Sequence, residues 1–177
     1  MGGYTAFAIA QKYPESVKNL LLYSTAGNNG LFDLLDPLTT NPVTAKTVGS
    51  LIEAIGKNPF FVKLIMSWAT QDKAYLEGYD YEALMAPYRI EGTGEGIVYS
   101  LSTHTKTDYD AVAKMPPMLF LNGSRDTVCP LAERINLRSA LPEGSVDFIM
   151  EGAGHMLIES RAAEVASVTL DFLSENP

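Results

Sequence analysis

The sequence predicts an α/β fold with a mostly parallel sheet, and three observations support this prediction. Three short apolar runs, LLLY, MLFLNG and VDFIM, have the length of strands. In LLLY and MLFLNG the apolar residues are continuous and do not alternate with polar ones, as expected of strands that helices cover on both faces. Segments with apolar residues at helical spacing separate the runs, and this alternation favours parallel pairing. The chain of 177 residues, 46% of them hydrophobic, is long enough to bury a core around such a sheet.

The first predicted helix spans residues 3–13 and is rich in small side chains, which allow close packing against a sheet. Tyr13-Pro14 ends this helix, because a residue before proline disfavours the helical conformation. The strand LLLY follows, and the turn residues AGNNG at 26–30 end that strand.

Residues 27–107 are predicted to form an all-helical insertion between strands. None of its segments shows an apolar run as continuous as those of the predicted strands. Four segments carry apolar residues at helical spacing: TAKTVGSLIEAIG, PFFVKLIMSWAT, DYEALMAPYRI and GEGIVYSLSTHT. We therefore expect two domains, a core made of residues 1–26 and 108–177 and the helical insertion of residues 27–107.

The core resumes with the strand MLFLNG, whose start is marked by Pro116 and Pro117 because proline donates no backbone hydrogen bond. A helix opened by proline is expected over residues 130–140, and the strand VDFIM follows it. After the loop EGAGH, a terminal helix is expected over residues 162–173, with its apolar residues on roughly one side.

Composition and charge exclude several classes of partner. The net charge of −8, with no cluster of Lys and Arg, argues against nucleic acid or an anionic membrane surface. No apolar stretch approaches the length of a membrane span. The single cysteine, Cys129, excludes an internal disulfide, so we expect a reducing, cytoplasmic location. No cluster has metal-ligand spacing and no glycine-rich phosphate loop follows a strand, so neither a metal nor a cofactor is expected.

Two loops that follow predicted strands carry the residues with catalytic chemistry. Ser124-Arg125-Asp126 comes directly after MLFLNG, and Glu151-Gly152-Ala153-Gly154-His155 comes directly after VDFIM. Active-site residues of open α/β sheets lie just past the carboxyl ends of strands. A buried carboxylate beside an imidazole fixes the tautomer of the ring and stabilises the imidazolium that forms when it accepts a proton. Asp126 and His155 are therefore the candidate catalytic residues.

Each of these residues also has a purely structural interpretation. Asp126 alone is typical of a turn, and His155 alone could cap a helix or sit hydrogen-bonded in the core. Cys129 is best interpreted as a small buried hydrophobe. His104 is interpreted as a surface or pocket-lining residue, and Ser24 lacks the glycines expected around a nucleophile.

Four segments, taken together, resemble the C-terminal part of an α/β-hydrolase. Met1-Gly2-Gly3 is similar to the residues that directly follow the nucleophile in this family, and Tyr13-Pro14-Glu15 to the end of the helix after it. LFLNGSRDTVCP resembles the segment that carries the acid of the catalytic triad, and GAGH the segment that carries its base. The order nucleophile, acid, base is also the order of the family. The helical insertion resembles the variable cap, or lid.

The resemblance implies a serine hydrolase, esterase-like, whose triad consists of a serine, Asp126 and His155. The serine would directly precede Met1, and Met1 would supply a backbone N–H of the oxyanion hole. The expected reaction is hydrolysis of a small, partly apolar ester, amide or related carbonyl compound without a cofactor. In relatives with an aspartate nucleophile the next residue is typically Trp, so Met1 favours serine.

A second interpretation belongs to a different class of protein. The chain itself would be a fragment without a nucleophile, either inactive or serving as a binding or assembly piece. Loss of a serine nucleophile costs on the order of a million-fold in turnover. The strand LLLY would also lack a neighbour on one side, which leaves an edge prone to association.

Overall fold

The computed structural model describes residues 2–25, 37, 39–102 and 108–177. The chain divides into two compact units. The sheet unit consists of Met1–Asn28, Ala69–Asp72 and Lys106–Pro177, and the helical unit consists of Asn29–Trp68 and Lys73–Thr105. The insertion is predicted over residues 27–107, whereas the helical unit begins and ends two residues inside these bounds and Ala69–Asp72 groups with the sheet. The predicted turn AGNNG lies outside the described residues.

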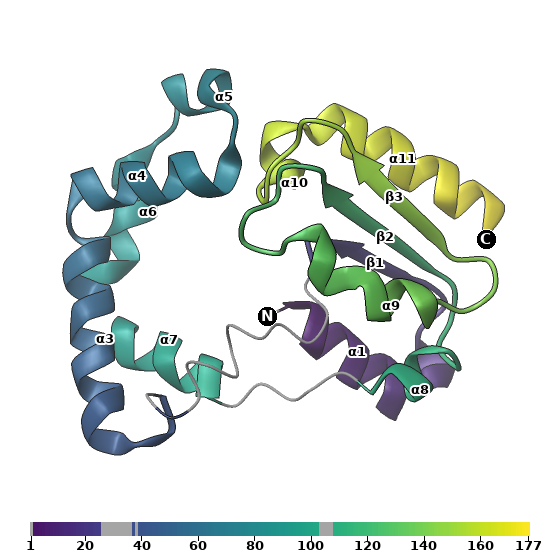
Figure 1. Cartoon of the computed structure of the whole chain (residues 1–177), viewed down its shortest axis with the longest axis horizontal. Helices are drawn as coiled ribbons and strands as arrows, with labels where there is room; N and C mark the ends of the chain where they lie inside the picture. Colours follow the sequence, from purple (N-terminus) through teal and green to yellow (C-terminus); the bar gives the residue numbers. More distant parts are fainter. Residues whose placement is uncertain (1, 26–36, 38, 103–107) are drawn as a thin grey trace. The chain divides into compact units, whose positions relative to one another are not determined.

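The sheet consists of β1 (Leu20–Tyr23), β2 (Met118–Gly123) and β3 (Val146–Met150), which are the three strands predicted from the sequence. The strands are all parallel, with β2 between β1 and β3 (Figure 1). In the register, Leu22 lies opposite Phe120. The prediction of a parallel α/β sheet is thus confirmed.

One face of the sheet is covered by α1 (Gly2–Lys12), α8 (Tyr109–Val112) and α9 (Ile135–Ser139) (Figure 1). The apolar cluster on this face joins every second residue of β1 and β2 to the facing side of the three helices. Its members include Phe7, Ala10, Leu20, Leu22, Val112, Met118, Phe120 and Leu137. The small side chain of Ala10 is almost fully buried here, as expected of a helix that packs closely on a sheet.

The other face of the sheet is covered by α10 (Leu157–Ser160) and α11 (Ala162–Glu175). The alternate residues of β2, Leu119 and Leu121, pack here with residues of both helices and with the end of β3. Phe172 near the end of α11 is 2% exposed. All six residues of β2 are buried, as expected of a strand that helices cover on both faces.

The outer strands are less buried than the sequence predicts. Leu21 in β1 is 36% exposed although its neighbours Leu20 and Leu22 are buried, and Phe148 and Ile149 in β3 are also exposed. Among the described residues, β1 pairs only with β2 and β3 only with β2. Strands with one neighbour are covered less completely than a central strand, so the expectation of full burial holds for β2 alone.

The helical unit contains α3 (Pro42–Gly56), most of α4 (Pro59–Thr70), α5 (Lys73–Glu77), α6 (Tyr81–Met85), η2 (Ala86–Arg89) and α7 (Thr93–Ser102). Asn41 caps α3, since its Oδ1 accepts hydrogen bonds from the N–H groups of Val43 and Thr44. The described part of this unit is helical, as predicted for the four amphipathic segments.

Helices α3 and α7 approach closely because glycines face each other. A Cβ atom added to Gly94 would overlap the carbonyl oxygen of Gly49, and one added to Gly49 would lie 2.9 Å from the backbone nitrogen of Glu95. Glu53 of α3 accepts hydrogen bonds from the N–H groups of Gly92 and Gly94, both 3.1 Å long. A carboxylate thus caps the amino end of α7, where the helix dipole favours negative charge.

Three short elements differ from the predicted helices. Residues 130–140 form η3 (Leu131–Arg134) followed by α9, where a single helix is predicted. Neither α8 nor α10 is predicted, because four-residue helices are too short to show an apolar period. The 3-10 turn η1 (Pro14–Ser16) follows α1 directly, at the proline predicted to end that helix.

Candidate active site

Asp126 lies in the tight loop that follows β2, and its carboxylate is fully buried. Its Oδ1 atom accepts hydrogen bonds from the N–H groups of Val128, at 2.9 Å, and Cys129, at 2.7 Å. This local turn, typical of aspartate after a strand, fixes the orientation of the carboxylate. The second oxygen, Oδ2, is thereby directed away from the turn and is available to another partner.

That partner is His155. Its Nδ1 atom lies 3.0 Å from Asp126 Oδ2, and the side chain of His155 is 31% exposed. The predicted pair is therefore in contact, although 29 residues separate the two positions in the sequence. A carboxylate at Nδ1 holds the proton on that nitrogen, so in the neutral ring Nε2 carries the lone pair.

The backbone of His155 is held from two other segments. Its N–H donates to the carbonyl of Ala69, at 2.8 Å. Its carbonyl accepts a hydrogen bond of 2.6 Å from the hydroxyl of Ser24, which follows β1. Ser24 has a φ of 48°, a left-handed conformation that is unusual for a residue other than glycine. Ser24 and Ala69 are positioning residues that the sequence does not reveal, because both act through tertiary contacts.

The two loops interlock through backbone contacts. Arg125 N–H donates to the carbonyl of Ala153, and Ser124 N–H donates to the carbonyl of Met150. The Ser124 hydroxyl also accepts from the N–H of Gly152 and donates to Glu151. The two loops are therefore fixed to each other directly as well as through the sheet.

Two glycines allow this close approach. A Cβ atom on Gly123 would overlap the carbonyl oxygen of Ala153, and one on Gly154 would overlap the carbonyl oxygen of Thr70. The glycines of MLFLNG and GAGH are thus required by packing between backbones. Gly152, with a φ of 75°, meets the other common requirement for glycine, a left-handed turn.

The surroundings of His155 change its acidity. Burial of the ring lowers the pKa of His155, but the hydrogen bonds and negative charge provided by Asp126 and Cys129 outweigh burial and raise the pKa from 6.5 to about 9. The pair thus stabilises a positively charged imidazolium, which is the form that a general base reaches when it accepts a proton.

Cys129 belongs to the same cluster. One ligand atom each of Asp126, Cys129 and His155 lie within 4.8 Å of one another, and Cys129 is a buried free thiol. In the part of the chain that the structure describes, this is the group of side chains that could hold a metal ion. Spacing in the sequence does not reveal it, because His155 comes from a different loop.

Two of the other candidate residues cannot be compared with the structure. Met1, predicted to supply the oxyanion N–H, and His104 both lie outside the described residues. Gly2 and Gly3 begin α1.

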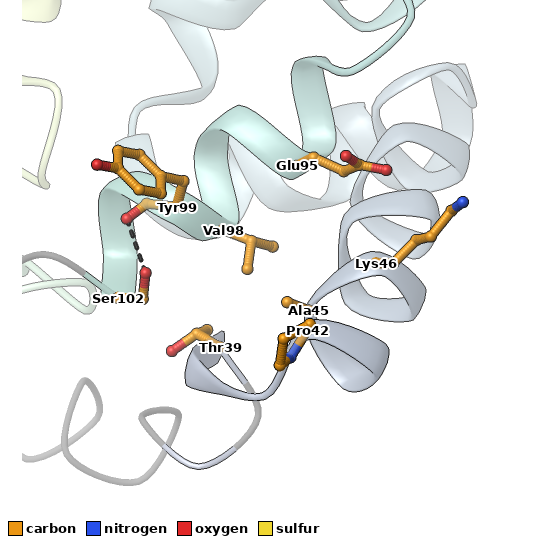
Figure 2. Close-up of a pocket in the computed structure, with 8 residues that line it drawn as sticks. All are labelled: Thr39, Pro42, Ala45, Lys46, Glu95, Val98, Tyr99 and Ser102. Atoms are coloured by element: carbon orange, nitrogen blue, oxygen red, sulfur yellow. Dashed lines mark hydrogen bonds between the residues drawn. The ribbon is translucent and has the colours of Figure 1, made fainter.

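Pockets are found in the described part of the helical unit. An apolar pocket of about 310 Å³ is lined by residues of α3, α4, α6 and η2, among them Ile55, Met66, Leu84 and Tyr88. A second pocket, of about 280 Å³, lies between the start of α3 and α7 (Figure 2). Figure 2 shows Tyr99 and Ser102 on its α7 side, where the Ser102 hydroxyl donates to the Tyr99 carbonyl. Neither lining contains a histidine, cysteine or aspartate.

A helix that spans a bilayer has to be long and apolar. None of the helices in the described ranges combines the length and the apolar character that a bilayer span needs.

Comparison with known proteins gives one family and several related structures. The family model described as serine aminopeptidase, S33, matches residues 1–161. A serine hydrolase involved in carbazole degradation is 18% identical, with a TM-score of 0.66 over 98% of this chain and 60% of that one. No match is found among curated proteins.

Two further structures resemble the chain to a similar degree. A thermophilic esterase from Thermogutta terrifontis is 17% identical, with a TM-score of 0.64 over 99% of this chain and 63% of that one. A meta-cleavage product hydrolase from Pseudomonas fluorescens is 17% identical, with a TM-score of 0.67 over 99% of this chain and 62% of that one. The chain thus spans less than two thirds of the length of these proteins, and at such identities the likeness shows a common fold.

Proposed function

The chain belongs to the serine aminopeptidase S33 family and has the α/β-hydrolase fold predicted from its sequence, and from this premise we propose that the full-length protein is a serine hydrolase. Its reaction is the hydrolysis of a small ester, amide or related carbonyl compound. Its catalytic base is His155, and Asp126 is the carboxylate of the triad that orients His155. The 177-residue chain without a nucleophile is inactive.

The observation that carries this proposal is the contact between His155 Nδ1 and Asp126 Oδ2 at 3.0 Å. With the Nδ1 proton held by a buried carboxylate, Nε2 accepts a proton from the nucleophile and later returns it to the leaving group. Asp126 stabilises the imidazolium formed in between. Both loops follow the carboxyl ends of parallel strands, the position typical of catalytic residues in such sheets.

The nucleophile, in this proposal, is a serine directly before Met1 in the full-length protein. The sequence Met1-Gly2-Gly3 supports this assignment, because it resembles the residues after the nucleophile in the family. The N–H of Met1 then contributes to the oxyanion hole, which stabilises the tetrahedral intermediate. Water attacks the acyl enzyme, and His155 deprotonates that water.

The proposed substrate is a small molecule with an apolar part. The apolar pocket of the helical unit, the proposed cap of residues 27–107, supports this preference. The free thiol of Cys129 agrees with the proposed cytoplasmic location, where thiols stay reduced.

The proposal is tested by measuring kcat/KM on a series of p-nitrophenyl esters with the full-length protein. We expect His155→Ala to reduce kcat/KM by at least about 10³-fold, because removal of a triad base leaves only binding and the oxyanion hole. The matched control is His104→Ala, the substitution of the other histidine, which should retain activity within about threefold. Undiminished turnover in His155→Ala would refute the assignment.

The same assay distinguishes the alternative in which the protein is a binding or assembly piece. Full-length protein that is folded but hydrolyses no ester, amide or lactone of graded acyl length would favour that alternative. Turnover by the isolated 177-residue chain that disappears in His155→Ala would contradict the proposed nucleophile.

A further inference from the structure

Cys129 lies beside the proposed catalytic pair but has no role in the proposed reaction. We propose that Asp126, Cys129 and His155 form a binding site for one thiophilic divalent cation such as Zn²⁺, and that occupation of this site blocks hydrolysis. The binding itself does not depend on the proposed function, whereas the block rests on it.

The donor set is the first argument. Thiolate, imidazole and carboxylate are the three ligand types that zinc takes in proteins, and a thiolate selects against Mg²⁺ and Ca²⁺. One ligand atom from each residue lies within 4.8 Å of the others. In a tetrahedral zinc site with bonds of about 2.0–2.3 Å, the ligand atoms are roughly 3.3–3.8 Å apart. The Nδ1–Oδ2 distance of 3.0 Å therefore has to widen by a few tenths of an ångström, and a separation near 4.8 Å has to shorten by about 1 Å.

The local backbone holds two of the ligands in place. Asp126 Oδ1 accepts the N–H of Cys129 at 2.7 Å, so the thiol is fixed one short turn away from the carboxylate. Because Oδ1 is occupied by the N–H groups of Val128 and Cys129, Oδ2 is the oxygen that faces His155 and would bind the metal. Asp126 and Cys129 are buried, and the partly exposed His155 gives the cation a route from solvent.

Metal binding would disrupt the hydrogen bond of the proposed catalytic pair. The cation takes one lone pair of Asp126 Oδ2 and the lone pair of His155 Nδ1, the ring nitrogen that faces this oxygen. The Cys129 thiol and the imidazolium each release one proton to solvent, which leaves the ring neutral with its remaining proton on Nε2. The hydrogen bond between Asp126 and His155 is thereby replaced by two metal bonds. His155 can then no longer accept a proton from the nucleophile, so the cation acts as an inhibitor and has no part in the reaction.

Cobalt gives a readout that does not need activity. Cys129 is the sole cysteine of the sequence, so a thiolate-to-Co²⁺ charge-transfer band in the near ultraviolet can arise from no other side chain. We titrate the 177-residue chain with Co²⁺ in a phosphine reductant that does not bind metals. We expect one equivalent to saturate the band and Zn²⁺ to displace Co²⁺, while millimolar Mg²⁺ has no effect.

Matched variants separate this site from adventitious binding. Cys129→Ser should abolish the band. His155→Ala should weaken the Co²⁺ affinity at least tenfold, whereas His104→Ala should leave it unchanged, with circular dichroism confirming that each variant is folded. The inference is overturned if the folded chain gives no band, or if His155→Ala binds Co²⁺ as tightly as the unsubstituted chain.

Activity is measured separately in the full-length protein. We expect micromolar Zn²⁺ to inhibit ester hydrolysis, a chelator to restore it, and Cys129→Ser to raise the inhibitory concentration at least tenfold relative to its own uninhibited rate. A cobalt band in a protein that hydrolyses nothing would contradict the proposed function and leave the site standing. Ester hydrolysis by a protein that gives no cobalt band would contradict the metal site and leave the proposed function standing.

Discussion

Close approach of two backbones occurs in two regions of the molecule, at the loops that follow β2 and β3 and where α3 crosses α7, and it has different consequences in each. In both places glycines let two backbones approach: Gly123 and Gly154 at the loops, Gly49 and Gly94 at the helices. At the loops this approach brings a buried carboxylate to a histidine. At the crossing it joins two amphipathic helices, and the nearby carboxylate, Glu53, caps the amino end of α7.

The two carboxylates of these regions differ in their partners. The charge of Glu53 is satisfied by the backbone and by Lys57, at 3.1 Å. Asp126 accepts the N–H of Cys129 with Oδ1, within its own turn, and contacts the ring of His155 from another loop with Oδ2. The partner of Asp126 is a histidine, whose charge can change near neutral pH, whereas the partners of Glu53 are backbone N–H groups and a lysine that stays charged there, so Glu53 stabilises structure.

Among the glycine substitutions in the two regions, Gly154→Ala is expected to have the largest effect. The added methyl group would overlap the carbonyl oxygen of Thr70, which cannot move away as a side chain could. We expect a loss of about 3 kcal/mol in the free energy of unfolding and, because His155 follows directly, a fall in kcat/KM of at least about 100-fold. Urea denaturation and ester hydrolysis measure the two quantities.

The control for this substitution is Gly78→Ala, because an added Cβ at Gly78 has no atom within 4 Å. Gly78→Ala should change neither quantity appreciably. Equal stability of the Gly154 and Gly78 variants would show that the backbones do not approach as described.

The second prediction concerns pH. The pKa of His155 rises from 6.5 to about 9 on folding, so the protonated ring stabilises the fold by up to about 3 kcal/mol. This stabilisation is fully present below pH 6.5 and is lost as the pH rises through 9. Because the base form is needed for catalysis, kcat/KM should rise with pH and level off near 9.

Nuclear magnetic resonance titration of the His155 ring measures this pKa directly. Asp126→Asn removes the negative charge that raises it, so the midpoint should move to lower pH in that variant. A midpoint unchanged by Asp126→Asn would mean that the carboxylate does not control the ring.

Gly94→Ala tests the other region of the comparison. The new methyl group would overlap the Gly49 carbonyl, and we expect a loss of about 2 kcal/mol confined to the helical unit. The matched control is Gly96→Ala two residues further along α7, where an added Cβ has open space. That variant should gain about 0.5–1 kcal/mol from higher helix propensity.

Hydrogen exchange of the α3 and α7 amides measures the local effect in both variants. The titration of His155 should be the same in Gly94→Ala as in the unsubstituted protein. A shifted His155 titration would show that the two regions are not independent.

Glu53→Gln is expected to change the free energy of unfolding least. Hydrogen bonds from Gly94 and then from Lys57 lower the pKa of Glu53. Its charge therefore contributes stability above the ordinary pKa of a glutamate, and this contribution is lost as the pH falls through the lowered value. Thermal unfolding of the two proteins should differ at pH 7 and converge at low pH. A constant difference at every pH would contradict an electrostatic cap.

The sequence predicts the elements that have strong local signals. The runs LLLY, MLFLNG and VDFIM are the three strands, and PFFVKLIMSWAT is helix α4 to the residue. Asp126 and His155 are predicted because each lies in the loop that follows a strand, and parallel strands bring their carboxyl ends to one edge. The structure shows their contact, while their catalytic role stays a prediction.

Features created by tertiary contacts escape sequence analysis. Ser24 is set aside for lack of flanking glycines, yet its hydroxyl holds the carbonyl of His155. Ala69 lies in the last turn of α4, within the predicted insertion, yet its carbonyl accepts the hydrogen bond from the N–H of His155. Cys129 is interpreted as a buried hydrophobe, and its approach to His155 depends on two loops that the sheet brings together.

The most direct measurement is covalent labelling of the full-length protein with a fluorophosphonate, followed by mass spectrometry of its peptides. If Asp126 and His155 activate a serine at the start of α1, the phosphonate will be found on the residue directly before Met1, and His155→Ala will take up none. A label on Ser24 or Cys129, or equal labelling of His155→Ala, would contradict the proposed catalytic pair.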